Sequence, residues 1–309
     1  MAPDTLASRR LGGVLASAVT TFDTWQGALT AEPFRANVRA HIAADVAGVV
    51  VGGSVGEAVL LTEEERARVA GWAREAVPAD RWLIVGTGAE STSLTLQRTQ
   101  AAGQLGADAV LVLPPSYYGA VMTRAALADH YWRVVDESAC GVVLYNAPQR
   151  AGFSLGGALV HALAAHEQVL GIVDASGDAA QLGEYLGAQH AHFSVLTGDA
   201  GGLADALATG ARGAMLDEAT FAPDCALAVE RALRRGDRAA TADAQATLGA
   251  LQARIGTLGP AGVKAALDAV GLHGGPVRAP LGALTAEQLA DVRACLREAG
   301  LLGVRTHAP

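Results

Sequence analysis

The chain has 309 residues, of which 51% are hydrophobic and 17% are charged. This is the composition of a globular protein with a sizeable apolar core. Its net charge of −8 argues against binding to nucleic acid or to an acidic membrane surface, because both require clustered positive charge. No uninterrupted apolar run reaches the roughly 18 residues that a membrane-spanning helix needs.

The three cysteines, Cys140, Cys225 and Cys295, are odd in number and far apart in the chain. Their spacing fits neither a disulfide framework nor a zinc site, so we expect a reducing, cytoplasmic compartment. The apolar run 11–19 is short and contains two glycines. We therefore interpret it as a first buried strand and not as a signal peptide.

Eight short apolar runs, rich in Val, Ile, Leu and Ala, predict strands that are buried on both faces. Thr62 precedes three glutamates, which predicts a helix N-cap followed by an acidic first turn. The predicted strands cover residues 13–20, 46–52, 82–87, 108–113, 141–145, 169–173, 193–197 and 211–216. The segments with helical periodicity between and after them are 31–45, 62–76, 92–105, 124–137, 155–166, 179–188 and 200–208.

Strands that alternate with helices predict a parallel sheet, and eight of them favour an α/β fold of the closed (β/α)8, or TIM, barrel type. A doubly wound open sheet is the alternative, but no glycine-rich phosphate loop follows the first strand. We expect the barrel to cover residues 1–222 and a C-terminal helical region, 223–309, to pack on it. The helical segments there are 222–235, 238–256, 261–270 and 284–300.

In a barrel of this kind the active site lies at the carboxyl ends of the strands. The loop Gly53–Val55 follows the second strand, where small residues allow backbone amides to bind an anion; a tight turn is the alternative. Tyr117 and Tyr118 follow the fourth strand. Tyr145 ends the fifth strand and Arg150 follows five residues later, a pairing that suits a proton-carrying phenol and a carboxylate clamp.

These strand-end residues, with several short motifs, resemble the dihydrodipicolinate synthase / N-acetylneuraminate lyase family of pyruvate-dependent class I aldolases. The resemblance extends from about residue 13 to about residue 283, which is nearly the whole chain. The motifs that carry it are Thr20-Thr21-Phe22, Gly53 to Glu57, Gly86-Thr87-Gly88-Ala89, Gly106-Ala107-Asp108, Tyr145 to Gly152, Ala175-Ser176-Gly177-Asp178, Thr197-Gly198-Asp199 and Pro260 to Lys264.

The resemblance implies a set of roles for these residues. Backbone amides around Ser54 and Val55, next to Gly53, would hold an α-keto carboxylate. Tyr145 would be the central proton-transfer phenol, and Arg150 would meet a carboxylate near the pocket mouth. Tyr117 would reach across an interface into a neighbouring subunit's site. Family members are commonly homotetramers built from tight dimers, so the resemblance also implies a homo-oligomer.

Two departures from the family pattern bear on the reaction. The family forms an imine between pyruvate and a lysine at the end of the sixth strand, and this position is Val173 here. The valine side chain has no nucleophilic atom, so an imine cannot form at position 173 among the substrate-binding residues. The hydroxyl residue that follows Ser54 in the family, and that relays protons to the tyrosine, is Val55.

The only lysine of the chain, Lys264, lies in the C-terminal helical region. It matches a lysine that the family often shows within a Pro-x-x-x-Lys stretch outside the innermost layer of the pocket. A lysine in a catalytic pocket must be desolvated to titrate near neutral pH. A helix of the extension is the wrong place for such a lysine.

Asp217 and Glu218 follow the eighth predicted strand, where the family usually has small, hydroxyl or apolar residues. Side chains alternate along a strand, so one of the two acids would face the barrel mouth if the strand continues. A carboxylate there would favour a cationic or hydrogen-bond-donating ligand group, or would act as an acid or base with a pKa raised by burial. A solvated loop start is the alternative.

Asp174, Asp199 and Asp217 all lie at predicted strand ends, where their oxygens would suit a hard cation. The first two have counterparts in the family that bind no metal, and the eight histidines form no close pair with ligand spacing. We therefore expect neither a metal site nor a cofactor.

The sequence favours an enzyme on an aldolase-family barrel that works without a Schiff base. We expect it to act on a small carboxylate or keto acid by acid/base proton transfer, as in lyase, dehydration, isomerisation or cyclisation steps. Tyr145, Tyr117 and Asp217 would be its catalytic residues. The Gly53–Val55 loop, Arg150, Val173 and Glu218 would form its substrate-binding residues.

Two alternatives remain open from the residues. The loss of side-chain function at Val55 and Val173 would also fit a catalytically inactive family member that acts as a ligand sensor or as an oligomer partner. An ordinary pyruvate aldolase that uses Lys264 is the third possibility.

Overall fold

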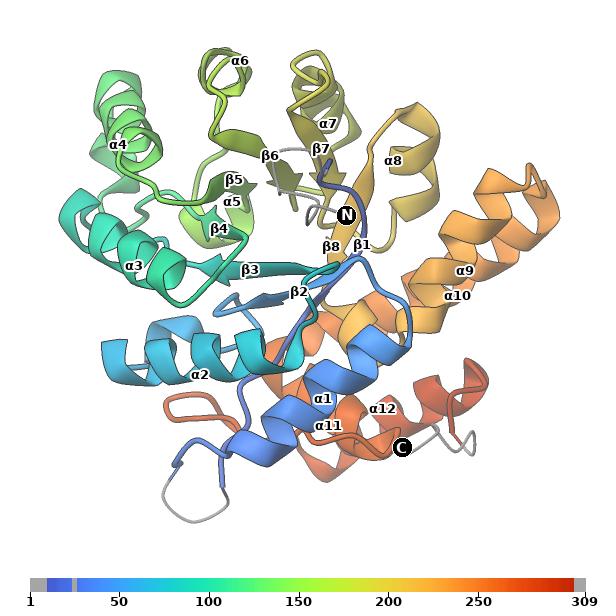
Figure 1. The fold of residues 1–309 in the computed structure, drawn as a ribbon. Helices are drawn as coiled ribbons and strands as arrows, with labels where there is room; N and C mark the ends of the chain where they lie inside the picture. Colours follow the sequence, from blue (N-terminus) through green and yellow to red (C-terminus); the bar gives the residue numbers. More distant parts are fainter. Residues whose placement is uncertain (1–9, 24–26, 303–309) are drawn as a thin grey trace.

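The structure is a computed structural model that describes residues 10–23 and 27–302. Eight strands form a closed barrel in which each strand is parallel to its neighbours and the first pairs with the last (Figure 1). This confirms the predicted (β/α)8 fold. The strands are β1 (Gly13–Ser17), β2 (Gly48–Val51), β3 (Trp82–Gly86), β4 (Ala109–Val112), β5 (Gly141–Asn146), β6 (Val169–Asp174), β7 (Ser194–Thr197) and β8 (Gly213–Leu216).

The strands separate two apolar layers, which explains why they appear as unbroken hydrophobic runs in the sequence. Along β5, Val143 and Tyr145 belong to the cluster that fills the barrel interior, together with Val173 of β6. Val142 and Leu144, the alternate residues, belong to the cluster between strands and helices. A strand that is buried on both faces needs apolar residues at both sets of positions.

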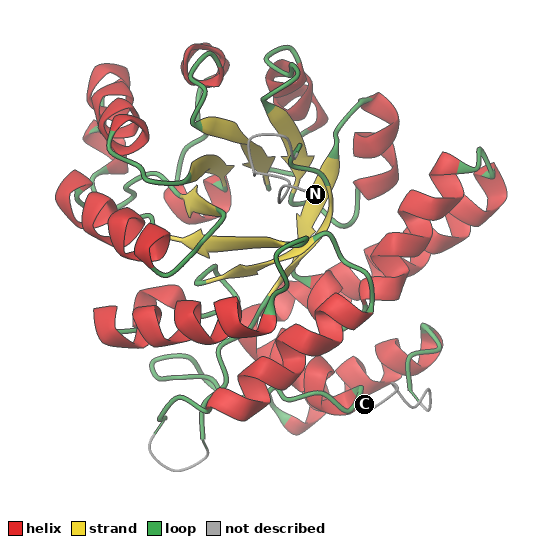
Figure 2. Cartoon of the chain, viewed as in Figure 1, coloured by secondary structure: helices red, strands yellow, loops and turns green. Residues whose placement is uncertain are grey.

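Helices surround the barrel, as Figure 2 shows. The cap predicted at Thr62 is confirmed, because its side chain accepts from the Glu65 amide while the Glu65 side chain binds the Thr62 amide. A single turn, α5, follows β5 and was not predicted. The helices between strands are α1 (Ala31–Ala43), α2 (Glu63–Ala76), α3 (Thr92–Gln104), α4 (Arg124–Asp136), α5 (Pro148–Ala151), α6 (Gly157–Ala164), α7 (Ala179–Leu186) and α8 (Leu203–Thr209).

The C-terminal helices gather on one side of the barrel, coloured orange to red in Figure 1. Val19 and Val55, from the ends of the first two strands, pack into the same apolar cluster as residues of these helices. The predicted segments are confirmed as helices, and the expected boundary at residue 222 falls between the 3₁₀ helix η4 (Glu218–Thr220) and α9. The helices are α9 (Pro223–Arg234), α10 (Arg238–Arg254), α11 (Gly259–Ala269) and α12 (Ala286–Glu298).

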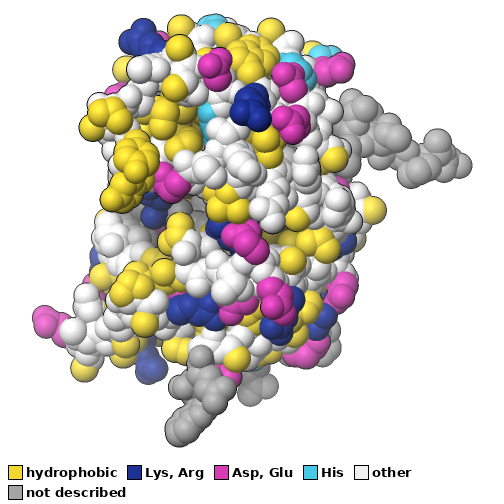
Figure 3. Space-filling model, turned by 90° about the vertical axis from the view of Figure 1, so that its left-hand side faces the viewer, with side chains coloured by type: hydrophobic (Ala, Val, Ile, Leu, Met, Phe, Trp, Pro, Cys, Tyr) yellow, Lys and Arg dark blue, Asp and Glu magenta, His cyan; other side chains and the backbone are white. Residues whose placement is uncertain are grey.

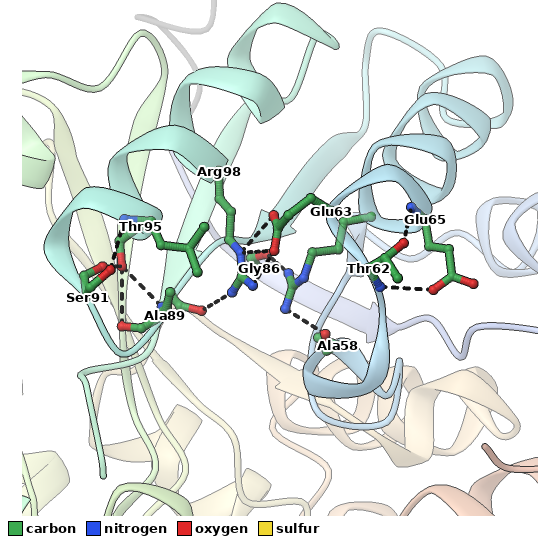
Figure 4. A network of polar contacts seen from close by, with 12 residues as sticks. Ala58, Thr62, Glu63, Glu65, Gly86, Ala89, Ser91, Thr95 and Arg98 are labelled. Carbon is green, nitrogen blue, oxygen red and sulfur yellow. Dashed lines mark hydrogen bonds and ion pairs between the residues drawn. The ribbon is translucent and has the colours of Figure 1, made fainter. Parts of the chain in front are cut away.

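Polar contacts join neighbouring helices at the barrel surface. Figure 4 shows Arg98 of α3 bound to the carboxylate of Glu63 at the start of α2, with the Nη2–Oε1 ion pair at 2.5 Å. On the face drawn in Figure 3, Lys and Arg side chains are scattered and lie beside Asp and Glu side chains. Within the described part of the chain, no helix combines the length and the apolarity needed to cross a membrane.

Candidate active site

A cavity of about 570 Å³ opens at the carboxyl ends of β5 to β8. The loops that follow these four strands form most of its wall, and α10 and the 3₁₀ helix η5 (Gly256–Leu258) complete it. This is the end of the barrel at which TIM-barrel enzymes place their catalytic residues. The polar side chains that line it include Tyr145, Arg150, Asp199, Asp217, Glu218 and Gln252.

Tyr145 lies at the centre of the polar groups of this cavity and is only 7% exposed. Burial raises the pKa of its phenol above the ordinary value, and the nearby Asp217 raises it further. Arg150 and Ser54, both within hydrogen-bonding reach of the phenol, act in the opposite direction. A phenol is protonated at neutral pH at its ordinary pKa and remains so here, so that it can donate a proton.

The Gly53–Val55 loop presents a hydroxyl group to the tyrosine, contrary to the expectation that the relay is lost. We assigned the family's relay hydroxyl to the position of Val55 and counted it as lost, and that side chain is 1% exposed and packs among apolar residues such as Val19 and Phe221. The hydroxyl of Ser54 takes the position beside Tyr145 instead. The loop itself is near the phenol, but the described residues that line the cavity do not include Gly53, Ser54 or Val55.

Both acids after the eighth strand face the cavity, whereas strand alternation predicted one. β8 ends at Leu216, and a helical turn begins at Glu218. The change of backbone direction brings Asp217 and Glu218 to the same wall. Burial raises the pKa of Asp217, with Arg150 and Ser17 opposing the shift. Burial, followed by repulsion from Asp217, raises the pKa of Glu218 to about 8.

Val173 lies in the barrel interior and is fully buried. It pairs with Tyr145 across β5 and β6, so the two side chains are direct neighbours on the inner face. Met215 and Leu196 belong to the same apolar cluster. Val173 is therefore an apolar neighbour of Tyr145 in the barrel interior, is not among the described residues that line the cavity, and supplies no amine to it.

Lys264 is 1% exposed and lies away from the residues that line the cavity. Its Nζ is 2.5 Å from Oε1 of Glu57 and donates to the carbonyl oxygen of Pro276 at 2.7 Å. The ring of Phe22 lies 4.4 Å from the same nitrogen. Burial lowers the pKa of Lys264, while Glu57 raises it. Lys264 is thus engaged with the back of the loop that carries Ser54.

Tyr117 lies on the surface after β4 and is 79% exposed. Its backbone N–H donates to Glu90 at 2.8 Å, and its ring meets that of Tyr118 edge-on at 5.0 Å. It does not line the cavity within the described residues of its own chain. The role that the resemblance implies for Tyr117 in a neighbouring subunit's site therefore stays a prediction.

Three contributors to the site were not expected as functional residues. Gln252 comes from α10 and donates to Oδ1 of Asp199 at 2.9 Å, which orients that carboxylate at the cavity wall. Ser17, at the end of β1, is close enough to bond Asp217. Asp199 was considered only as a metal ligand. No sequence signal marks a glutamine in the middle of a helix for such a role.

No group of three or more His, Cys, Asp or Glu side chains is arranged to hold a metal ion in the described ranges 10–23 and 27–302. The three cysteines are free thiols.

The closed barrel, the helical extension and the polar cavity at the carboxyl ends of the strands define a TIM-barrel protein with a candidate active site where TIM-barrel enzymes have theirs. The chain belongs to the dihydrodipicolinate synthetase family, whose model matches residues 10–299.

Curated relatives and solved structures agree with this assignment. The chain is 35% identical over 294 residues to an uncharacterised DapA-like lyase of Halobacterium salinarum, covering 94% of this chain and 95% of the relative. It is 33% identical over 288 residues to the 4-hydroxy-tetrahydrodipicolinate synthase of Methanoculleus marisnigri, covering 92% and 98%. The structure is similar to that of YagE, a prophage protein of the dihydrodipicolinic acid synthase family from E. coli K12 in complex with pyruvate. That similarity has a TM-score of 0.88 and 29% identity, and covers 94% of this chain and 99% of YagE.

Proposed function

We propose that this protein is a lyase-type enzyme that acts on a small carboxylate or keto acid by acid/base proton transfer, without a Schiff base. The observation that carries the proposal is the buried phenol of Tyr145 at a cavity whose described lining has an arginine and three acids but no lysine. The reaction would be an elimination, dehydration, isomerisation or cyclisation, each of which needs a proton removed and another delivered.

Four polar groups at or beside the cavity have a place in this scheme. Arg150 binds the substrate carboxylate, since a guanidinium offers two parallel N–H donors to a carboxylate. Asp217 acts as the base, because a pKa raised by burial moves a carboxylate closer to neutral pH. The phenol of Tyr145 then donates its proton to the atom on which negative charge develops. Ser54 is close enough to return a proton to the phenol.

Covalent catalysis through an imine is not part of the proposal. Val173 has no nucleophilic atom, and Lys264 is paired with Glu57 outside the described wall of the cavity. Glu218 lines the cavity as Asp217 does and would bind substrate there. The Gly53–Val55 loop lies outside the described lining and would act through the Ser54 hydroxyl near Tyr145.

We also infer that the working form is a homo-oligomer in the cytoplasm, a dimer or a tetramer of tight dimers. Tyr117 and Tyr118 are large exposed side chains beside one another, at 79% and 65% exposure. Aromatic side chains are enriched where protein surfaces meet, and Tyr117 would extend into the neighbouring site. Three free cysteines suit a reducing compartment.

Proton exchange tests the proposal without knowledge of the natural product. A panel of small carboxylates and keto acids is incubated with the protein in D₂O, and loss of the carbon-bound proton next to the carboxyl or keto group is followed by ¹H NMR. We expect exchange above the uncatalysed rate for at least one compound. Tyr145→Phe should reduce that rate about 10²- to 10⁴-fold, which is the usual contribution of a positioned acid or base.

Tyr131→Phe is the matched control. Tyr131 is fully buried and donates to the carbonyl of Val112, so this variant also loses a buried phenol oxygen, but outside the cavity. An unchanged exchange rate in Tyr145→Phe would refute the assignment. If no compound shows proton exchange, the ligand-sensor or oligomer-partner role is favoured instead.

Intact-mass measurement tests the absence of an imine. The protein is treated with pyruvate and borohydride, which reduces any imine to a stable secondary amine. We expect the mass to remain unchanged under conditions that label a lysine-bearing family member. A mass increase at Lys264 would establish the ordinary aldolase route.

A further inference from the structure

The two acids that follow β8 are adjacent in the chain but have different surroundings. Burial raises the pKa of Asp217, while Arg150 and Ser17 are close enough to favour its charged form. The hydrogen bond to the carboxyl group of Glu218 comes from its own backbone N–H. The charged groups that act on Glu218 are two other acids, Asp217 and Asp199. Of the two neighbouring carboxyl groups, Asp217 is therefore the one whose negative charge is stabilised.

Glu218 also differs from the other buried acids in the described part of the chain. Glu57, Asp108 and Asp174 are buried too, and each accepts a hydrogen bond from another residue. A buried carboxylate without such donors is strongly unfavourable, so the uncharged carboxylic acid suits the surroundings of Glu218. The donors to the other three are the Arg278 amide for Glu57, the Leu83 amide for Asp108 and the Asn146 side chain for Asp174.

The side chain of Glu218 meets the cavity. It is 4% exposed and lines the cavity together with Asp217. A Cβ atom at Gly256 would lie 2.4 Å from Oε1 of Glu218, so glycine at this position leaves room for the carboxyl group against the backbone of η5. An uncharged carboxyl group carries one O–H donor. Glu218 thus presents a proton donor to the same cavity to which Asp217 presents an acceptor.

We propose that Glu218 is a second catalytic residue of this cavity, the acid that protonates the group that leaves the substrate. This inference rests on the proposed function in taking Asp217 as the base of the same cavity, and it narrows the reaction to an elimination. The phenol of Tyr145 meets the oxygen on which negative charge develops as the carbon-bound proton is lost, so the leaving group needs a separate acid. Two carboxyl groups whose surroundings favour different protonation states suit opposite roles as acid and base.

The elimination uses one proton transfer at each acid. The carboxylate of Asp217 removes the proton from the carbon next to the substrate's keto or carboxyl group. The electron pair of that C–H bond forms a carbon–carbon double bond, and the C–O bond at the following carbon breaks. The leaving oxygen takes the proton of Glu218 and departs as water. Asp217 then loses its proton to solvent and Glu218 regains one, which restores the starting state.

The pKa of Glu218 agrees with this role. Burial raises it to about 8, and repulsion from Asp217 and Asp199 contributes to the shift. The carboxyl group is therefore protonated at neutral pH and remains acidic enough to give up its proton, since an acid is most effective when its pKa lies near the working pH. The other charged or titratable groups among the described residues that line the cavity are Tyr145 and Arg150.

Leaving groups of different basicity test the role of Glu218. A hydroxyl group needs a proton in order to leave, whereas chloride leaves without one. The protein is incubated with three hydroxy acids and their chloro analogues, and the vinyl protons of the unsaturated products are followed by ¹H NMR. The pairs are L-malate with chlorosuccinate, 3-hydroxybutyrate with 3-chlorobutyrate, and 4-hydroxy-2-oxobutanoate with 4-chloro-2-oxobutanoate. We expect elimination above the uncatalysed rate for both members of at least one pair.

Variants separate the acid from the base. Glu218→Gln should slow the loss of hydroxyl about 10²- to 10⁴-fold, the usual contribution of a positioned acid, and the loss of chloride by less than about 10-fold. Asp217→Asn should slow both reactions, because each needs the base. Glu230→Gln is the matched control, since its side chain is only 15% exposed but lies in α9, outside the described lining of the cavity. It should leave both rates as they are. Circular dichroism verifies that each variant is folded.

The pH dependence should also differ between the two leaving groups. The loss of hydroxyl should decline as the pH rises through about 8, where Glu218 gives up its proton, and the loss of chloride should not. His41 binds the carbonyl of Thr220 in η4. Burial lowers the pKa of this histidine to about 4, so it stays neutral throughout this range.

Three results would overturn the inference. They are an unslowed loss of hydroxyl in Glu218→Gln, equal slowing of hydroxyl and chloride loss in that variant, and elimination of chloride but never of hydroxyl by the unsubstituted protein. The last result would leave the proposed function standing. Conversely, if Tyr145→Phe reacts at the unchanged rate while Glu218→Gln loses only the elimination of hydroxyl, the assignment of the phenol fails and the role of Glu218 stands.

Discussion

Two buried groups of charges in this molecule differ in how they are balanced. Behind the Gly53–Val55 loop, Glu57 meets Lys264 at 2.5 Å and accepts from the Arg278 amide at 2.7 Å. At the cavity, Asp217 and Glu218 lie on one wall, and neither has a lysine partner. The first group is complete within the protein. The second is balanced only in part, because Arg150 and Ser17 act on Asp217 whereas the hydrogen bond to Glu218 comes from its own backbone N–H. Titratable groups with strongly shifted pKa values in a cavity indicate a candidate functional site.

The difference separates a structural role from a binding role. Glu57 has a positive φ of 54°, a backbone conformation that is uncommon for residues other than glycine. Its pairing with Lys264 and the hydrogen bond from Arg278 hold it there. The Glu57 amide donates to the Ser54 carbonyl at 3.1 Å, and this bond helps to hold Ser54 near Tyr145. Lys264, the only lysine of the chain, therefore helps to support the Gly53–Val55 loop from outside the cavity.

The largest effect should come from breaking the buried ion pair between Lys264 and Glu57. Lys264→Met leaves Glu57 buried without its cation, and we expect a loss of about 3–5 kcal/mol in the free energy of unfolding. Urea unfolding followed by circular dichroism measures it. The double variant Glu57→Gln/Lys264→Met should recover part of this loss, because no charge is then left unpaired. A loss below about 1 kcal/mol would show that the pair is not buried in solution.

A pH-dependent effect of similar size at its fullest should come from Glu218 at the cavity. The pKa of Glu218 is about 8 in the folded state, against 4.5 when unperturbed. A raised folded-state pKa means that its favourable contribution is complete below pH 4.5 and is lost as the pH rises through about 8. Since one pKa unit corresponds to about 1.4 kcal/mol, the loss amounts to a few kcal/mol. Glu218→Gln should lack this decline, and parallel stability curves for the two proteins would contradict the assignment.

A substitution next to the incomplete group should have a moderate effect. Gly256→Ala places a Cβ 2.4 Å from Oε1 of Glu218, the end of a side chain that can turn aside, so we expect a loss at the lower end of the about 1–3 kcal/mol that overpacking costs. Gly249→Ala in α10 is the control, because the nearest heavy atom to its Cβ is 4.0 Å away. It should be neutral or stabilising by up to about 1 kcal/mol, the helix preference of alanine over glycine. Equal melting temperatures of the two variants would show that Glu218 does not pack against η5.

The smallest effect should come from an ion pair at the surface. Glu63→Gln removes the contact with Arg98 that Figure 4 shows, in which the glutamate side chain is 47% exposed. Water and salt screen such a pair, so we expect a change of about 0–1 kcal/mol that shrinks further at high salt. Thermal unfolding at two salt concentrations measures it. A loss as large as that of Lys264→Met would mean that burial does not distinguish these pairs.

Much of the fold could be predicted because the spacing of apolar residues along the chain reflects which side chains are buried. All eight strands occur within a few residues of the predicted runs, and the cap at Thr62 is present. The site was harder to predict. The hydroxyl beside Tyr145 belongs to Ser54 and not to the position after it. Only one of Asp217 and Glu218 was expected to face the cavity, because the turn that ends β8 cannot be inferred from strand alternation.

The sequence by itself determined the barrel, the strand-end positions of Tyr145 and Arg150, and the absence of an amine at Val173, because these follow from local pattern and residue type. The tertiary structure decided which charges are balanced. Lys264 and Glu57 are more than 200 residues apart in the chain, and only packing of α11 against the barrel brings them together. Whether a buried charge is paired depends on its neighbours in space. The one lysine of the chain is paired with Glu57, whereas Glu218 lines the cavity without a lysine partner.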